Sequence, residues 1–329
     1  MRNAIRVMCL VVSVAALASI ASALEIETVD VGNPGNVNDT HGAGFGSVGY
    51  AYKIGKYEVS NAEYCEFLNA KAALGDPHAL YNVNMASGWN DTGGIAKSGS
   101  GTPGDPWAYS PRTNRANRPV NYVSFWDACR FTNWLHNGQG AADTENGAYT
   151  LTTNGIANNT VTRNPNWKWA VTSLDEWYKA AYYDGDNAVY YDYPTGSDTA
   201  PTAELPSGTD LTNGSANYHS GGFMDTTWYT TEQGAYDAKP SDSPYGTFDQ
   251  GGNLWEWNES VSGNFRGWKG GSLGDVVNYL HPSSGQNTSP ASESQLLGFR
   301  VAEVPEPATM AILMLGGIGI LRKRKRLQR

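Results

Sequence analysis

The stretch Pro244-Tyr-Gly-Thr-Phe-Asp-Gln-Gly-Gly-Asn-Leu-Trp-Glu-Trp-Asn-Glu-Ser260 decides the fold of this chain. Alternation places Trp255 and Trp257 on one face of an extended segment. Because aromatic side chains bury large areas, the stretch predicts a central core strand. Asn253 and Glu256 lie beside a flexible Gly-Gly pair and offer the oxygen ligands that calcium prefers. Core packing with locally satisfied polar groups is the alternative explanation for the same residues.

This stretch resembles the Gly-Asn-Val-Trp-Glu-Trp signature of the sulfatase-modifying factor family, whose namesake is the formylglycine-generating enzyme. Further pieces match that family in the same order: Tyr52–Tyr64, Arg118–Ala128, Asp175–Ala181, Gly270–Ser272 and Gly298–Val301. Together they extend over roughly residues 50 to 302. The resemblance implies an α+β fold of the formylglycine-generating-enzyme type, which is C-type lectin-like, irregular and loop-rich, with antiparallel strands and a few short helices.

The catalytic residues of the family are missing from this sequence. Active formylglycine-generating enzymes place two copper-binding cysteines between Gly-Gly-Ser and the final Gly-Phe-Arg, and copper(I) needs such soft thiolates. Here Leu273 to Leu297 contains no cysteine. Some members without these cysteines use a His-x-x-x-Glu iron site, but none of the five histidines has a glutamate four residues later. Copper is therefore not expected, and we predict no catalytic residue and no cofactor-binding residue.

The resemblance also implies a structural calcium ion. An Asn-Tyr pair helps to hold it in the family, through a side-chain oxygen and a backbone carbonyl, and this pair corresponds to Asn217 and Tyr218. Asp225 is a weaker candidate for a further ligand. With Asn253 and Glu256 these residues form the predicted metal site, although an ordinary Asx-turn at Asn217 is the alternative.

The charge distribution excludes several classes of partner. The net charge is −9, and eight of the 23 Lys and Arg residues lie in the two ends of the chain, so the body is more acidic still. Because nucleic acid and anionic lipid require a positive field, we do not expect the body to bind them. Acidity together with 38 glycines and many Asn, Thr and Ser residues is typical of a loop-rich secreted protein.

Both ends of the chain have the features of targeting signals. Residues 1–23 have two arginines, an apolar run and Ala-Ser-Ala, which predicts a secretory signal peptide rather than a first membrane span. The predicted domain covers residues 24–303. The tail, 304–329, contains Pro305, Glu306 and Pro307, then an apolar run and a basic cluster. It resembles the PEP-CTERM sorting signal, which implies an exosortase as partner.

The apolar run of the tail, Ala308 to Leu321, predicts a short transmembrane helix. At about 1.5 Å per residue it reaches about 21 Å, less than the roughly 30 Å of a hydrocarbon core. Its basic end would remain cytoplasmic, which puts the body in the periplasm. The body is then either anchored there or released to the cell surface or the extracellular matrix after cleavage.

Three capping boxes predict helices within the domain, at Ser60, Ser124 and Ser173. Residues 25–31 and 50–59 predict strands, and residues 148–151 and 160–162 predict a hairpin. Residues 75–117 form a long Gly/Pro/Asn-rich insertion. Cys65 and Cys129, on two of the predicted helices, are either a disulfide, which the oxidising periplasm permits, or two buried free thiols.

These observations lead to two main functional hypotheses; a hydrolase or another enzyme built on the same scaffold is a third, for which nothing in the sequence names a substrate. The first is a noncatalytic, exported domain that binds a ligand, such as a polysaccharide, at the cell envelope or in the exopolysaccharide matrix through exposed Trp and Tyr residues. The alternative is a formylglycine-generating-type oxidoreductase that acts on a protein cysteine and has replaced the missing ligands. Absence of thiolates between Ser272 and Gly298 favours the first.

Overall fold

The computed structural model describes residues 23–41, 44–208, 210–237 and 240–304. The predicted signal peptide, apart from its last residue, lies outside the described residues. So does the tail from Pro305 onward, with the Pro-Glu-Pro motif and the predicted transmembrane helix. Within the described ranges, no helix has the length and the hydrophobicity that a membrane span requires.

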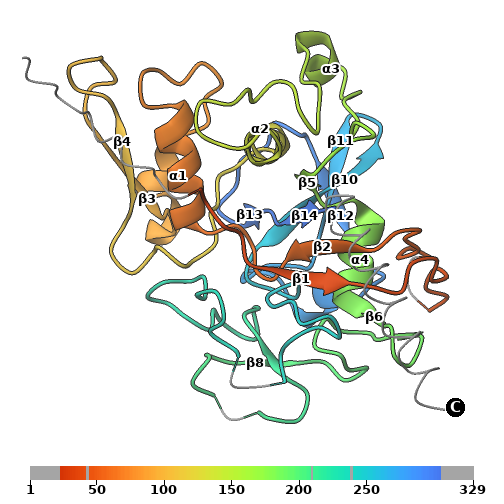
Figure 1. Ribbon diagram of the computed structural model, residues 1–329. Coiled ribbons are helices and arrows are strands. Elements are labelled where there is room, and N and C mark those ends of the chain that lie inside the picture. Colours follow the sequence, from red (N-terminus) through yellow and green to blue (C-terminus); the bar gives the residue numbers. More distant parts are fainter. Residues whose placement is uncertain (1–22, 42–43, 209, 238–239, 305–329) are drawn as a thin grey trace, which may run out of the picture.

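Two four-stranded sheets organise the fold, and they meet at the final Gly-Phe-Arg motif (Figure 1). The first has the order β1-β2-β14-β5 and is antiparallel. The second has the order β12-β11-β10-β13, in which β10 and β13 are parallel. The strands are β1 (Thr28–Val31), β2 (Tyr52–Gly55), β5 (Trp169–Val171), β10 (Trp255–Ser262), β11 (Phe265–Lys269), β12 (Gln286–Thr288), β13 (Leu297–Gly298) and β14 (Val301–Glu303).

Phe299 and Arg300 connect the two sheets, since β13 belongs to one sheet and β14 to the other. The close approach at this junction requires glycine at position 298. A Cβ atom there would lie 2.8 Å from the carbonyl oxygen of Val120 and 3.0 Å from Leu254. This contact gives a physical reason for the glycine that precedes Phe-Arg in the motif.

The three predicted capping boxes are confirmed. Each serine hydroxyl accepts the backbone N–H three residues later, and the acidic side chain at that later position returns to the serine N–H. The helices are α1 (Asn61–Lys71), α2 (Phe125–His136) and α4 (Leu174–Tyr182). These boxes satisfy N–H groups that a helix would otherwise leave unpaired, and they fix where each helix begins.

An aromatic core lies between α1, α2 and the sheets. The ring of Phe131 on α2 contacts Tyr64 and Phe67 on α1 and Phe299 of the final motif, with centroids 5.4–6.0 Å apart. Trp255 and Trp257 on β10 are buried, as predicted from their alternation, and both stack on Trp268 of β11. The predicted core strand is therefore confirmed, and it starts at Trp255.

Two regions differ from the sequence prediction. The hairpin predicted from residues 148–162 is wrong: a short helix, α3 (Thr153–Ala157), occupies the connection, and only a single bridge joins Tyr149 to Arg163. Thr152 caps this helix through its hydroxyl, a signal that the β-branched residues around it concealed. The insertion 75–117 is also more ordered than predicted. It contains η1 (Val83–Ala86), η2 (Trp89–Asp91), β3 (Ile95–Ser98) and β4 (Ala108–Pro111).

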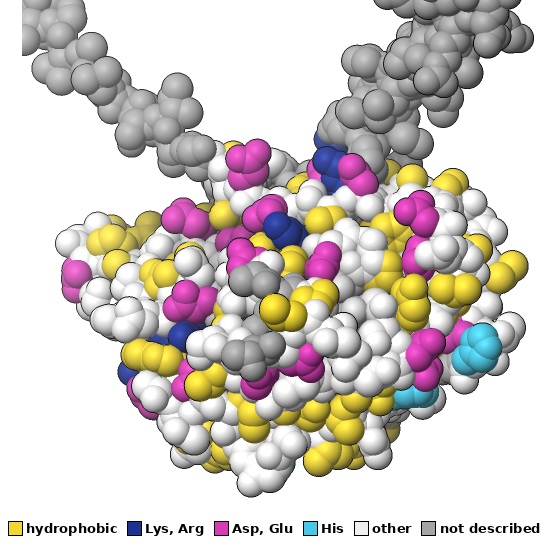
Figure 2. All heavy atoms as spheres, turned by 90° about the horizontal axis from the view of Figure 1, so that it is seen from below, with side chains coloured by type: hydrophobic (Ala, Val, Ile, Leu, Met, Phe, Trp, Pro, Cys, Tyr) yellow, Lys and Arg dark blue, Asp and Glu magenta, His cyan; other side chains and the backbone are white. Residues whose placement is uncertain are grey.

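The region between α4 and β10 consists mainly of turns and lies below the sheets in Figure 1. Its regular elements are β6 (Tyr183–Asp184), β7 (Val189–Tyr190), β8 (Thr202–Ala203) and β9 (Ser215–Ala216), and η3 (Val277–Leu280) follows β11. Figure 2 shows the face of the molecule seen from below, where acidic side chains are spread widely and Lys and Arg are few. This surface agrees with the acidity of the body.

Candidate functional site

Glu256 and Arg300 form a fully buried ion pair at the centre of the molecule. Arg300 Nε lies 2.6 Å from Glu256 Oε2, and Nη2 lies 2.7 Å from Oε1, which is the bidentate geometry of a strong charge-assisted pair. Trp177 Nε1 donates to Glu256 Oε2 at 2.7 Å. The remaining N–H groups of Arg300 reach backbone carbonyls of Gly55 and Phe248. Residues from three of the matching motifs therefore meet at one carboxylate, and Gly55 of a fourth motif contacts Arg300.

Asn253 is fixed by a second set of hydrogen bonds next to this pair. Its Nδ2 donates to Glu58 Oε2 at 2.6 Å, and the N–H of Leu254 donates to Glu58 Oε1. Its Oδ1 accepts from the N–H of Thr231 at 3.0 Å and from Asn217 Nδ2 at 3.3 Å. Burial raises the pKa of Glu58 well above its usual range, and the nearby carboxylate of Glu256 raises it further.

The structure brings together only part of the predicted calcium site. Asn217 and Asn253 are in contact, whereas both oxygens of Glu256 already bind Arg300 and Trp177. The Oδ1 atom of Asn217 is buried and has no hydrogen-bond partner among the described residues. An orphaned carboxamide oxygen of this kind fits a calcium ligand.

The other two predicted ligands, Tyr218 and Asp225, are occupied differently. The Tyr218 hydroxyl donates to the carbonyl of Pro201, which leaves its own backbone carbonyl as the candidate ligand. Asp225 Oδ1 accepts from the N–H groups of Thr227 and Trp228, which is an Asx-turn. No cluster of three or more His, Cys, Asp and Glu residues suited to a metal occurs in the part of the chain that the structure describes. Any calcium would therefore depend on amide and carbonyl oxygens.

The segment that carries the catalytic thiols in active enzymes holds a serine and a carboxylate here. The Ser272 hydroxyl donates to Asp275 Oδ2, and the carbonyl of Asp275 accepts from the N–H of His219 at 2.8 Å. Ser272 is thus hydrogen-bonded to a carboxylate and not to an imidazole, the base that activates a nucleophilic serine. The arrangement supplies neither a thiolate nor an activated hydroxyl.

Both cysteines of the domain are free thiols in the structure, so the disulfide alternative does not occur there. They lie on different helices, Cys65 on α1 and Cys129 on α2, and both are buried. Burial raises the pKa of Cys65 to about 12 and that of Cys129 well above its usual range. Because a thiolate is the form that binds metal or attacks a substrate, these groups are structural.

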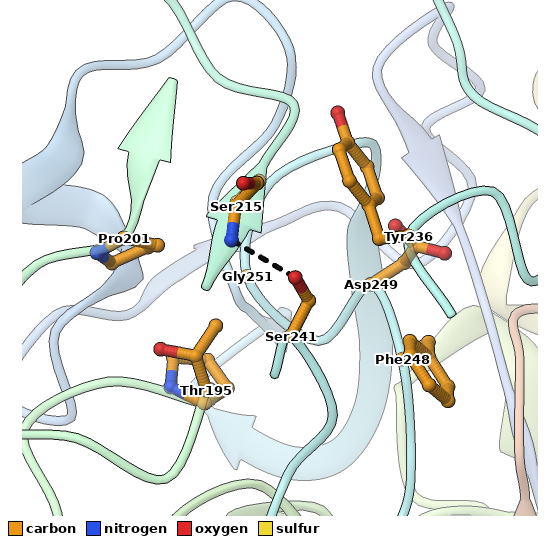
Figure 3. A pocket seen from close by; sticks show the side chains of 10 residues that line it. Thr195, Pro201, Ser215, Tyr236, Ser241, Phe248, Asp249 and Gly251 are labelled. Atoms are coloured by element: carbon orange, nitrogen blue, oxygen red, sulfur yellow. Dashed lines mark hydrogen bonds between the residues drawn. The ribbon is translucent and has the colours of Figure 1, made fainter. Parts of the chain in front are cut away.

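A small cavity lies beside Asp249, within the region between α4 and β10 (Figure 3). Its lining includes Thr195, Ser215, Ser241 and Tyr236, and Ser215 N donates to Ser241 Oγ at 2.9 Å. The volume is about 10 Å³, which is room for about one water molecule. Burial raises the pKa of Asp249 to about 7. The cavity is too small to hold a substrate.

A partly exposed group of aromatic residues was not predicted as an assembly from the sequence, and we call it the aromatic cluster: Trp89, His219, Phe223 and Tyr229. The rings of Trp89, Phe223 and Tyr229 contact one another edge to face, with centroids 5.3–5.5 Å apart, and His219 packs on Phe223. Trp89 is 40% exposed. The only sequence signal was Trp89 itself, because its partners are more than 125 residues away in the chain.

A second buried charge network was also missed. Arg163 pairs with Glu176 at 2.7 Å and with Glu259 at 2.8 Å, and Tyr149 donates to Glu259. Glu176 also closes the capping box of α4. The network connects α4, β10 and the segment that follows α3, and both of its carboxylates are largely buried. It therefore belongs to the scaffold.

Comparison with known proteins identifies the fold and the family. The model of the sulfatase-modifying factor enzyme 1-like domain matches residues 45–304, and the model of the PEP-CTERM protein-sorting motif matches residues 303–326. No curated protein matches the chain. The sorting motif implies export and exosortase-mediated sorting at the membrane of a Gram-negative envelope.

Several solved structures are similar to this chain. Variable protein 1 of Treponema denticola has a TM-score of 0.50 and 18% identity, and the match covers 86% of this chain and 97% of that one. CarF has a TM-score of 0.47 and 21% identity, with 86% and 99% covered. PvdO of Pseudomonas aeruginosa has a TM-score of 0.45 and 15% identity, with 86% and 93% covered. Because the family model matches well over half of the chain, the protein belongs to the family of sulfatase-modifying factor enzyme 1-like domains, and it carries a PEP-CTERM sorting motif.

Proposed function

We propose that this protein is a noncatalytic member of its family that binds polysaccharide at the cell envelope or in the extracellular matrix. The observation that carries the proposal is the segment from Leu273 to Leu297, which contains no cysteine. In the same place Ser272 is bonded to Asp275, and the two remaining thiols are buried elsewhere. The scaffold of the family is present, and the groups that oxidise a cysteine are not.

The aromatic cluster supports the binding part of the proposal. Large aromatic side chains are favoured at binding surfaces because they offer a broad apolar face at low entropic cost. The main chain at Trp89 is fixed, since its backbone N–H donates to the Tyr122 hydroxyl at 2.8 Å. Asn90 Nδ2 donates to the Tyr229 hydroxyl at 3.2 Å, which adds a polar group at the rim. A rigid aromatic surface with polar edges suits the alternating apolar and hydroxyl-bearing faces of a sugar chain.

Binding of the purified full-length chain to the exopolysaccharide of its host tests this proposal. We expect saturable binding that Trp89→Ala weakens by about tenfold or more, the effect of losing an interface anchor. The matched control is Phe265→Ala, because Phe265 is 47% exposed and lies outside the aromatic cluster. Equal binding by both variants, or no binding by the wild-type chain, would contradict the proposal.

A structural calcium ion at Asn217 is a separate proposal. The orphaned Asn217 Oδ1 and the carbonyl of the adjacent Tyr218 support it, and Asp225 is a weaker candidate for a further ligand. In this scheme Asn253 positions Asn217 through the contact between their amides, and Glu256 remains paired with Arg300. The ion would hold the turn region against β10 and would perform no chemistry.

Processing of the tail is the last part of the proposal. We propose that exosortase-type machinery cleaves near Pro305-Glu306-Pro307 after the apolar run has been inserted into the membrane. The mass of the mature protein tests this. We expect a chain that ends near residue 304 in the wild type, and a chain with the intact tail in a Glu306→Ala variant. A mature wild-type chain that still contains Arg329 would indicate a permanent anchor.

A further inference from the structure

A cleft at the start of the domain serves no part of the proposed function. It has a volume of about 370 Å³. It lies between α1, the end of α2, the loop 138–140 and the first two residues that the structure describes, Ala23 and Leu24. The wall on α1 consists of Glu66, Asn69 and Ala70. The described chain therefore enters the domain through this cleft.

Gln139 binds both backbone groups of Leu24 in the cleft. Its Nε2 donates to the Leu24 carbonyl oxygen at 2.7 Å, and its Oε1 accepts from the Leu24 N–H at 2.7 Å. The Leu24 side chain packs against the aromatic core, whereas Ala23 is exposed. One carboxamide thus fixes Leu24 on the domain, and the residue before it lies at the surface.

The loop that carries Gln139 has an unusual backbone. Gly138, Gln139 and Gly140 have φ angles of 88°, 68° and 59°. A residue with a side chain adopts this left-handed region only at an energetic cost. Two hydrogen bonds hold the loop: the Gln139 N–H donates to the Trp134 carbonyl at 2.8 Å, and Trp134 Nε1 donates to the Gly140 carbonyl at 3.0 Å. The strained conformation places the Gln139 carboxamide against the backbone of Leu24.

Two places in the leader have the small-residue pattern that a signal peptidase cleaves, Ala16-Leu17-Ala18 and Ala21-Ser22-Ala23. Cleavage after Ala18 would leave residues 19–23 in front of Leu24. Cleavage after Ala23 would convert the Leu24 N–H, which donates to Gln139, into the α-ammonium group of the mature chain. The contact at Gln139 therefore favours the second place.

The charge of the cleft suits an ammonium group. Glu66 is the one formally charged side chain among the described residues that line it. Lys71, one turn further along α1, is outside the lining and donates to the carbonyls of Ala141 and Ala142. An α-amino group is mostly protonated at pH 7, because its ordinary pKa is about 7.7–8.0. A mature N-terminus at Leu24 would therefore share the cleft with a carboxylate and with no competing cation.

We propose that export processing cleaves the bond between Ala23 and Leu24, and that the cleft binds the α-ammonium group that this cleavage creates. Hydrolysis by a signal peptidase consumes one water molecule and leaves a carboxylate on Ala23 and an ammonium group on Leu24. Gln139 Oε1 and the carboxylate of Glu66 then accept from the ammonium group, as in other sites that capture a chain terminus. The unprocessed chain lacks this charged contact, so the domain reaches its full stability only after cleavage.

The first residue of the mature protein tests the position of the cut. The protein is purified from the envelope of its host, and its N-terminal peptide is identified by mass spectrometry. We expect Leu24 to be the first residue. A mature chain that begins at Ser19, or at any residue other than Leu24, would overturn the inference.

The melting temperature of the exported protein tests the ammonium site. In one variant Gly-Ser is inserted between Ala23 and Leu24, so that cleavage after Ala23 leaves a neutral peptide N–H at Leu24. We expect the insertion to lower Tm by about 2–4 °C, the scale of one charge-assisted contact in a domain of this size. Glu66→Gln should cause a similar loss in the native chain and no further loss in the insertion variant. Equal losses from Glu66→Gln with and without the insertion would overturn the inference.

Gln139→Asn tests the carboxamide that holds Leu24. The shorter side chain tolerates the left-handed backbone but cannot reach Leu24, so we expect Tm to fall in both the native chain and the insertion variant. Gln286→Asn makes the same change at an exposed residue of β12 and should leave Tm unchanged. A Tm that Gln139→Asn does not alter would also overturn the inference. These measurements need no glycan, so their failure is distinct from a failure of the proposed polysaccharide binding.

Discussion

The buried centre of this molecule and the segment that carries the catalytic thiols in active family members preserve very different amounts of the family pattern. At the centre, Glu256 pairs with Arg300 and accepts a hydrogen bond from Trp177, so residues of three matching motifs meet there. The segment from Leu273 to Leu297, by contrast, contains none of the thiols that carry the chemistry in active members of the family. The lesson is that the signature motifs of this family report the scaffold. Their presence is no evidence for the oxidase reaction.

Breaking the central pair should have the largest effect. Arg300→Ala leaves the carboxylate of Glu256 buried without its partner, and we expect the free energy of unfolding to fall by about 3–5 kcal/mol. The matched control is Lys56→Ala, which breaks the more exposed pair with Glu27 and should cost less than about 1 kcal/mol. Urea unfolding measures both, and similar losses for the two variants would contradict a central structural role.

The pH dependence of stability should reveal the buried acid of α2. Burial raises the pKa of Asp127 to about 7, although its hydrogen bonds with Ser124 act to lower it. Between pH 4 and pH 7 the folded state then holds a proton that the unfolded state has lost. The contribution of Asp127 to the free energy of unfolding therefore decreases as pH rises. The loss is up to about 1.4 kcal/mol per unit of pKa shift.

Asp127→Asn should remove this dependence, because an amide does not titrate. We expect the stability of the variant relative to wild type to increase from pH 4 to pH 7, as measured by urea unfolding at several pH values. The exposed Asp105→Asn is the control and should change nothing. A difference between wild type and Asp127→Asn that stays constant with pH would show that Asp127 is ionised throughout.

Calcium should stabilise the chain at Asn217, which contacts Asn253 next to the buried centre. At a free concentration of about 100 times its Kd, the ion would stabilise the chain by about 2.7 kcal/mol, and chelation would lower Tm accordingly. Asn217→Ala should abolish this response, whereas Asn287→Ala, at an exposed amide, should retain it. A Tm that does not respond to calcium would show that the chain binds no structural calcium ion.

The aromatic cluster, which lies outside both regions, should give the smallest effects on stability and the clearest effects on binding. Trp89→Ala should change the free energy of unfolding by less than about 1 kcal/mol, since the side chain is 40% exposed. We expect its binding loss of about tenfold to appear without a change in Tm. If Tm falls by as much as in Arg300→Ala, the aromatic cluster is part of the scaffold.

Local signals in the sequence predicted local structure well. The boxes at Ser60, Ser124 and Ser173 begin helices, because each hydrogen-bonded ring closes within four residues. The hairpin at residues 148–162 was mispredicted, because Thr152 acts as a helix cap and the β-branched residues suggested a strand. Propensity is a weak guide over so short a segment.

Long-range contacts could not be predicted from the sequence. Arg300 lies 44 residues from Glu256, so nothing in the spacing showed that this carboxylate pairs with a guanidinium. The aromatic cluster has the same difficulty, since Trp89 meets Tyr229 only through the fold. Unpaired atoms such as Asn258 Nδ2 can be recognised only when all their neighbours are known. Sites on this scaffold are therefore products of tertiary packing.

Mass spectrometry of a cysteine-containing sulfatase peptide tests the central claim most directly. The peptide is incubated with the purified full-length chain, copper and oxygen, and an active formylglycine-generating enzyme serves as the positive control. Since no thiolate lies between Ser272 and Gly298, we predict that the peptide cysteine remains unchanged while the control converts it. Conversion to formylglycine by this chain would contradict the account and would require a metal site of another kind.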